Sequence, residues 1–324
     1  MERSQHLLAM ETRVRALELV DDLYSRFVDS IDVPSREHAR SLPHTLRLAP
    51  SPSARWSEVF THEVTLAAPL LFAQGMIGVA SEQVQDAVLA HALAVIGAFG
   101  KDRILDGQVE PTTELVSVLA AVRAGRERAM DRLAGPTRDY DLADERALSA
   151  MKVERLLLVR PRPMDLAMYQ TISIAKQTPG FPASLALAHR AGWPEEACKD
   201  VRRTLEDIAL GLQMHDDVVD WEKDAAVGGA WVVSLARAAP GWRDGRDETA
   251  LRQAVLDSGV AAKLLVAASQ RFACASVRAD RLGATRLSGW CLDRASKLTA
   301  LAEAEVRSAG YAVRAHMLTQ WALS

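Results

Sequence analysis

Apolar residues recur at intervals of three and four along almost the whole of this 324-residue chain, a spacing typical of amphipathic helices. Alanine, leucine and arginine dominate, and the alternating pattern of β-strands is nearly absent. Without a sheet, helices bury their apolar faces against other helices, so the pattern predicts an all-α protein. The sequence shows no internal repeat and no clear linker, which favours a single domain.

Turn residues divide the periodic stretches into separate expected helices. A first helix at 7–30 and a proline-rich irregular connection at 30–56 make up an N-terminal region, 1–56, and the helical domain covers 57–324. Within this domain the expected helices are 57–78, 81–105, 112–133, 143–159, 164–177, 182–191, 195–222, 248–274 and 284–322.

Composition excludes several classes of protein. Hydrophobic residues make up 49% and charged residues 25%, which is ordinary for a soluble globular protein with a sizeable core. The net charge of −3 lacks the basic surplus of a nucleic-acid-binding protein. We find no secretion signal and no apolar run that would span a bilayer, so we expect a cytoplasmic protein without stable membrane insertion. The three cysteines form no CxxC pattern and are expected to be reduced.

The segment GLQMHDDVVDWEKD (211–224) gathers acidic side chains on one expected helix. Residues three or four apart share a helix face, so Asp220 neighbours both Asp216 and Asp217, and Gln213 precedes Asp216 on the same side. Crowded carboxylates repel each other unless a cation neutralises them, and Mg²⁺ commonly combines carboxylate with phosphate oxygens. The pattern therefore predicts metal ligands. The competing interpretation is a solvated acidic helix face.

A second acidic pair lies in FGKDRILDGQ (99–108), at the end of a largely apolar expected helix. Asp102 and Asp106 are four apart and share a face. Two carboxylates at the end of a buried helix need a metal ion or a basic partner. The competing interpretation is salt bridging to Lys101, Arg103 or a neighbouring helix.

Both acidic segments together suggest two carboxylate faces that hold metal ions on a diphosphate. Such ions would stabilise the negative charge of a diphosphate leaving group as its carbon–oxygen bond breaks. The remainder of the expected cavity would be apolar and would suit a hydrocarbon chain.

These two motifs resemble those of a known family. QMHDDVVD (213–220) resembles the second aspartate-rich motif of trans-prenyl diphosphate synthases, where a glutamine precedes DDxxD by the same interval. DRILDG (102–107) resembles their first motif, DDxxDG, with Arg103 in place of the second aspartate. The remaining DxxxD spacing is also used by squalene and phytoene synthases.

A third segment, IAKQTPGFPASLALAHRAGW (174–193), resembles the Lys-Thr helix between those motifs, with Lys176 and Thr178 as the counterparts. The resemblance implies the class I isoprenoid synthase fold, in which a single-domain antiparallel helical bundle surrounds a deep apolar pocket with three Mg²⁺ ions at its mouth. It also implies a prenyl diphosphate substrate, and it leaves a homodimer open. The implied metal ligands and catalytic residues are Asp102, Asp106, Asp216, Asp217 and Asp220, and the implied substrate-binding residues are Gln213, Lys176 and Thr178.

Two segments of related enzymes are missing. We find no GGKRxRP, which builds the isopentenyl diphosphate site of chain-elongating enzymes, and no NDxxSxxxE, the metal motif of microbial terpene cyclases. These departures favour a divergent terpene synthase, a lyase that ionises an allylic prenyl diphosphate and cyclises or rearranges the cation. The alternatives are a trans-prenyltransferase that joins the prenyl group to isopentenyl diphosphate or another acceptor, and a non-catalytic helical scaffold.

Overall fold

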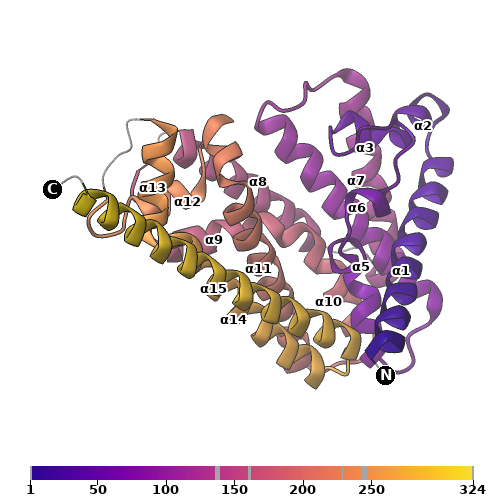
Figure 1. The fold of residues 1–324 in the computed structure, drawn as a ribbon. Coiled ribbons are helices and arrows are strands. Elements are labelled where there is room, and N and C mark those ends of the chain that lie inside the picture. The colour runs from indigo at the N-terminus through magenta and orange to yellow at the C-terminus, as the bar shows by residue number, and fades with distance from the viewer. Residues whose placement is uncertain (1, 136–138, 160–161, 228, 243–246, 323–324) are drawn as a thin grey trace. The chain divides into compact units, whose positions relative to one another are not determined.

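The computed structural model describes residues 2–135, 139–159, 162–227, 229–242 and 247–322. In the first helix it describes side chains from residue 15 on, and in the last helix it describes them up to residue 307. Every regular element in the described residues is a helix (Figure 1), which confirms the predicted all-α class. The chain divides into two compact units. Unit 1 comprises 1–151, 175–202 and 279–287, and unit 2 comprises 152–174, 203–278 and 288–324.

Unit 1 is built on two long helices that pack against each other, α6 (Ser81–Leu105) and α7 (Thr113–Ala134). Three further helices contact α6, namely α1 (Glu2–Ser30), α5 (Glu63–Phe72) and α10 (Phe181–Arg190). The shorter elements of this unit are α2 (Val33–Arg40), α3 (Leu42–Thr45), α4 (Trp56–Val59) and the single 3₁₀ turns η1 (Ala73–Gly75) and η2 (Thr178–Gly180).

Helices that contribute residues to both units are α8 (Asp139–Val159), α9 (Leu166–Gln177), α11 (Glu195–Val227), α14 (Val260–Arg281) and α15 (Thr285–Ala322). Unit 2 also contains α12 (Trp231–Ala236) and α13 (Glu248–Ser258), which contact each other.

The sequence of α6 explains its central position in unit 1. Val88, Ala92 and Ile96 are buried and recur every four residues. Near its end, Gly100 allows α7 to come close, because a Cβ atom there would lie 2.6 Å from a methyl carbon of Leu119. The helix that carries the first acidic motif is therefore fixed by packing up to its last turns.

The helix α14 has an apolar stretch that the sequence analysis did not recognise as long enough to span a membrane. By length and composition it could do so, but half of that stretch is buried inside the protein. Its buried residues Leu264, Ala268, Phe272 and Ala275 recur at intervals of three and four. This periodic burial is that of a helix packed on a protein core.

Three expected segments differ from the structure. The expected helix at 57–78 is divided into α4, α5 and the 3₁₀ turn η1, and residues 60–62 between α4 and α5 are not helical. The connection at 30–56 contains the short helices α2 and α3, because Pro34 and Pro43 lie in their first turns, where proline costs no hydrogen bond. The expected helix at 248–274 is two helices, since Gly259 adopts a left-handed conformation with φ +65° and ends α13.

Candidate active site

The first acidic motif lies at the carboxyl end of α6, as predicted. Asp102 is in the last helical turn and partly buried, whereas Asp106 is exposed and caps the helix by donating its backbone N–H to the Asp102 carbonyl. The Oδ1 atom of Asp102 lies 3.6 Å from Nζ of Lys176, whose side chain is only 12% exposed. Because the Lys176 side chain is mostly withdrawn from water, its electrostatic attraction to Asp102 is stronger than that of a fully exposed pair. Unit 1 thus brings together two of the predicted site residues from distant segments.

Arg103, which occupies the place of an aspartate in the family motif, is also half-buried near these charges. Burial lowers the pKa of Arg103, while the carboxylates of Asp102 and Asp106 oppose this shift and the charge of Arg47 adds to it. The two acidic side chains therefore lie among cationic groups of the same unit, Lys176 included.

A buried histidine fixes the segment that follows Lys176. Nδ1 of His91 lies 2.8 Å from the Gly180 carbonyl oxygen, and Nε2 lies 3.0 Å from the Thr65 carbonyl oxygen. Burial lowers the pKa of His91, although both carbonyls oppose the shift, so the neutral ring donates from one nitrogen at a time. The contact is close enough that a Cβ atom on Gly180 would lie 2.7 Å from Cε1 of His91.

Replacing Gly180 with alanine is expected to destabilise unit 1, because the new methyl group would meet the buried His91 ring. The loss should be about 1–3 kcal/mol, as for other overpacked interiors. Thermal unfolding followed by circular dichroism should show a lower midpoint. Gly289→Ala in α15 is the matched control, since nothing lies within 4 Å of its added Cβ. An unchanged midpoint for Gly180→Ala would show that His91 does not hold this segment.

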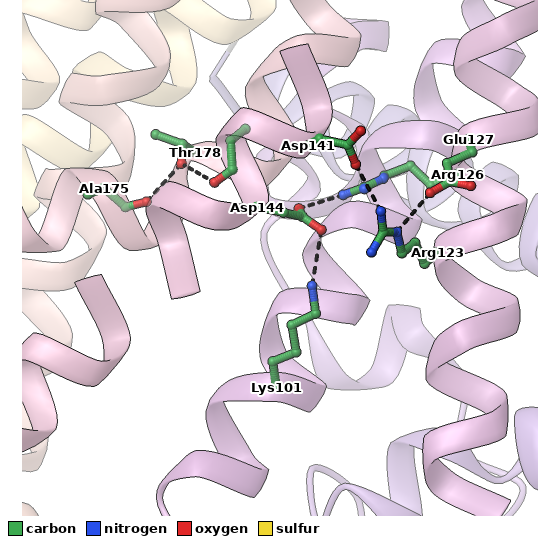
Figure 2. Close-up of polar contacts among 9 residues, drawn as sticks. Lys101, Arg123, Arg126, Glu127, Asp141, Asp144, Ala175 and Thr178 are labelled. Atoms are coloured by element: carbon green, nitrogen blue, oxygen red, sulfur yellow. Dashed lines mark hydrogen bonds and ion pairs between the residues drawn. The ribbon is translucent and has the colours of Figure 1, made fainter. Parts of the chain in front are cut away.

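Lys101, the residue before Asp102, pairs with a carboxylate of α8. Asp144 accepts hydrogen bonds from Nζ of Lys101 at 3.0 Å and from Nη1 of Arg126 at 2.6 Å (Figure 2). Burial alone would raise the pKa of Asp144, but Arg126 and Lys101 outweigh burial and hold this pKa below its usual value. The partly buried ion pair between Lys101 and Asp144 is one link between the end of α6 and α8 within unit 1.

Thr178, predicted to contact the diphosphate, is buried, and its hydroxyl is directed at the main chain. Its Oγ1 atom lies 2.8 Å from the Ala175 carbonyl oxygen and 3.1 Å from the Ala143 carbonyl oxygen (Figure 2). A hydroxyl has a single proton, which these two acceptors share. In this structure the side chain supports the end of α9, and its contact with a diphosphate stays a prediction.

The second acidic motif lies within α11, in unit 2, and its three aspartates differ in exposure. Asp216 and Asp220 are exposed, whereas Asp217 is only 7% exposed. The Oδ2 atom of Asp217 accepts a 2.5 Å hydrogen bond from the Tyr169 hydroxyl, and Oδ1 accepts a 2.9 Å bond from Nε2 of Gln213. Gln213 thus orients the carboxylate of Asp217, and its contact with a substrate stays a prediction.

Tyr169 contacts the second acidic motif, and the sequence did not predict this contact. Its ring is fully buried and packs edge-on against Trp231, with ring centroids 5.1 Å apart. Nε1 of Trp231 donates to Oε1 of buried Glu154 at 2.6 Å. Burial first, and then the charge of Asp217, raise the pKa of Tyr169 well above its usual value, so the hydroxyl remains a donor. No motif signals this contact, because it joins residues 48 positions apart.

In the described part of the chain, no group of three or more His, Cys, Asp or Glu side chains is assembled to hold a metal ion. The exposed carboxylates of Asp216 and Asp220 lie one helical turn apart on α11, and carboxylate oxygens are the ligands that Mg²⁺ prefers. Because Mg²⁺ usually takes one or two carboxylates and completes its shell with water and phosphate oxygens, this donor set fits the predicted ion.

The sequence matches no protein-family model and no curated protein. Solved structures match over most of the chain. A polyprenyl synthetase from Streptomyces coelicolor A3(2) aligns with a TM-score of 0.65 and 15% identity, over 86% of this chain and 98% of the other. A heptaprenyl diphosphate synthase from Staphylococcus aureus aligns with a TM-score of 0.67 and 12% identity, over 89% and 98%.

A further match is a polyprenyl synthase from Caulobacter crescentus CB15 complexed with calcium and isoprenyl diphosphate. It aligns with a TM-score of 0.59 and 16% identity, over 88% of this chain and 95% of the other. The chain therefore has the fold of the trans-prenyl diphosphate synthases, the class I isoprenoid synthase fold, as its motifs predicted. Identities this low show the fold alone.

Proposed function

We propose that this chain binds a prenyl diphosphate together with Mg²⁺ and breaks its carbon–oxygen bond, releasing diphosphate and an allylic cation. The observation that carries the proposal is the isoprenoid synthase fold with an acidic motif on each of the two helices, α6 and α11, where the resemblance expects one. Bound Mg²⁺ would supply electrophilic stabilisation of the leaving diphosphate.

Each of the two acidic motifs would supply ligands to Mg²⁺. Asp102 and Asp106 would bind from α6, and the exposed Asp216 and Asp220 from α11. Asp217 is held by hydrogen bonds to both of its oxygens, which supports a positioning role for it beside its predicted role as a ligand. Residues that orient metal ligands in this way contribute strongly to metal affinity.

Lys176 would exchange partners when substrate binds. In the structure it pairs with Asp102, so the charge of that carboxylate is already partly neutralised. A metal ion alone would then gain little there, because it would have to displace a cation. Mg²⁺ bound to diphosphate would take the carboxylate and offer phosphate oxygens to Lys176 in return. The charges of unit 1 therefore support joint binding of metal and diphosphate.

The fate of the cation separates two candidate functions. The matching structures include heptaprenyl and geranylgeranyl diphosphate synthases, which supports transfer of the prenyl group to an acceptor over the cyclisation that the sequence analysis preferred. Cyclisation remains the second candidate, because the sequence lacks the GGKRxRP segment of chain-elongating enzymes. An acceptor other than isopentenyl diphosphate would be consistent with both observations.

Incubation with Mg²⁺ and geranyl, farnesyl or geranylgeranyl diphosphate, with and without isopentenyl diphosphate, tests this function. We expect diphosphate release that stops when EDTA removes the metal. Mass spectrometry should find a longer product only when acceptor is present, whereas a terpene formed without acceptor would favour cyclisation. Mg²⁺ with diphosphate should also raise the melting temperature, since a ligand at 100 times its Kd stabilises by about 2.7 kcal/mol. No release and no stabilisation would indicate a non-catalytic scaffold.

A further inference from the structure

Unit 1 contains a second concave region whose chemistry the proposed function does not use. It is a cleft of about 580 Å³ lined by residues of α7, α8, α10 and the beginning of α11. Its volume is within the usual range of small-molecule sites, about 300–1,000 Å³. Asp102, Asp106 and Lys176 do not line it, although Thr178 does.

The cleft does not include the carboxylates of the first acidic motif. Leu133 lines it near the carboxyl end of α7, fourteen residues or about 21 Å of helix from Leu119, which packs beside Gly100. Its other side is nearer to the motif, because the lining residue Ala143 precedes Asp144, the partner of Lys101. Since neither Asp102 nor Asp106 lines the cleft, a ligand held by the cleft would be bound by other side chains than those of the motif.

The floor of the cleft is apolar. Met130, Leu133 and Phe181 line it and are at most 5% exposed, and the partly buried Leu185 lies among them. These side chains come from α7 and α10, whose packing against each other leaves the hollow open. A hydrocarbon group could pack against these side chains and would cover Leu142, a lining residue that is 62% exposed.

The rim of the cleft is cationic. Arg146, Arg190 and Arg202 line it with exposed side chains, and none of the three makes a hydrogen bond or ion pair with a residue in the described part of the chain. His189 adds a fourth basic group, and Asp139 is the single carboxylate among the lining residues. Guanidinium groups recognise phosphate and carboxylate oxygens through paired hydrogen bonds.

We propose that this cleft binds an amphipathic anion, a phosphate or carboxylate head group on a hydrocarbon chain. The head would lie between the rim arginines and the chain on the floor formed by α7 and α10. A head group without a tail would leave the exposed lining residue Leu142 in water, and a tail without a head would leave the arginines without an anionic partner. Both parts are therefore needed for full affinity.

Binding of decyl phosphate, below its micelle-forming concentration, tests the proposal by isothermal titration calorimetry. The buffer contains EDTA, so that metal-dependent binding at the acidic motifs does not contribute. Decanoate replaces the phosphate head with a carboxylate and identifies which of the two head groups is preferred. Inorganic phosphate and decanol supply the head and the tail alone. We expect decyl phosphate or decanoate to bind at least tenfold more tightly than either part.

Arg146→Gln and Arg202→Gln should each weaken binding by about tenfold, as expected when a hydrogen bond to a charged group is lost. Arg155→Gln, which removes an exposed arginine from unit 2, is the matched control and should leave affinity unchanged. Asp102→Asn should also bind normally. The proposal is overturned if the rim variants bind like the parent, if inorganic phosphate binds as tightly as decyl phosphate, or if Asp102→Asn abolishes binding.

Discussion

Asp216→Asn is expected to remain folded and to lose prenyl diphosphate turnover by roughly 10²–10³-fold, the usual cost of removing one electrostatic stabiliser of a transition state. The Asp216 side chain is 70% exposed, so the core of unit 2 does not depend on it. Asparagine keeps its shape but removes the negative charge that would hold Mg²⁺. Diphosphate release measured over a range of Mg²⁺ concentrations should show both slower turnover and a higher metal requirement.

Asp293→Asn is the control for this experiment, because Asp293 is also an exposed aspartate of unit 2 and pairs only with Lys297 one turn along α15. It should retain full turnover. Asp102→Asn, in unit 1, should behave like Asp216→Asn, which would connect both acidic motifs to the same reaction. If Asp216→Asn works at the parent's rate and metal concentration, its assignment as a metal ligand is wrong.

Tyr169→Phe should reduce turnover by roughly 10–100-fold, the cost typical of losing a group that orients a metal ligand. Phenylalanine fills the same space beside Trp231 but donates no hydrogen bond to Asp217. The buried carboxylate would lose a donor, at a cost to stability of about 1–3 kcal/mol. Denaturant unfolding measures this cost, and the Mg²⁺ concentration for half-maximal turnover should rise.

Trp231→Phe separates positioning from simple stability. It removes the hydrogen bond to Glu154 in the same buried network but leaves the bond between Tyr169 and Asp217 in place. We expect it to lower stability without changing the metal requirement. An equal rise in the metal requirement for both variants would mean that Tyr169 supports only the fold.

The long helices could be predicted from sequence because their periodicity extends over several turns. The predicted helix at 81–105 has the same bounds as α6. Gly107, which has a positive φ, follows its carboxyl end and ends the helical pattern. The helix α12 (Trp231–Ala236) was missed, since six residues are too few for a helical period to stand out. The left-handed turn at Gly259 was missed as well, because apolar spacing continues through it.

The spacing of the carboxylates also predicted correctly which helices carry them. It did not predict which carboxylates are buried or which side chains they contact. Asp216 and Asp217 are adjacent in sequence, and neighbouring residues point about 100° apart around a helix. Which of them is buried depends on the position of Tyr169, a residue of another helix. The pairing of Lys176 with Asp102 likewise depends on packing between segments 74 positions apart, which no local pattern encodes.

The helix α9 provides a side chain to each of two of these contacts. Tyr169, in its first turn, holds Asp217, and Lys176, at its end, holds Asp102. Tyr169 and Asp217 belong to unit 2, whereas Lys176 and Asp102 belong to unit 1. Each contact therefore depends on packing within its own unit, although both use a side chain of one twelve-residue helix. A helix-breaking residue such as proline in the middle of α9 would affect the polar contacts of both acidic motifs at once.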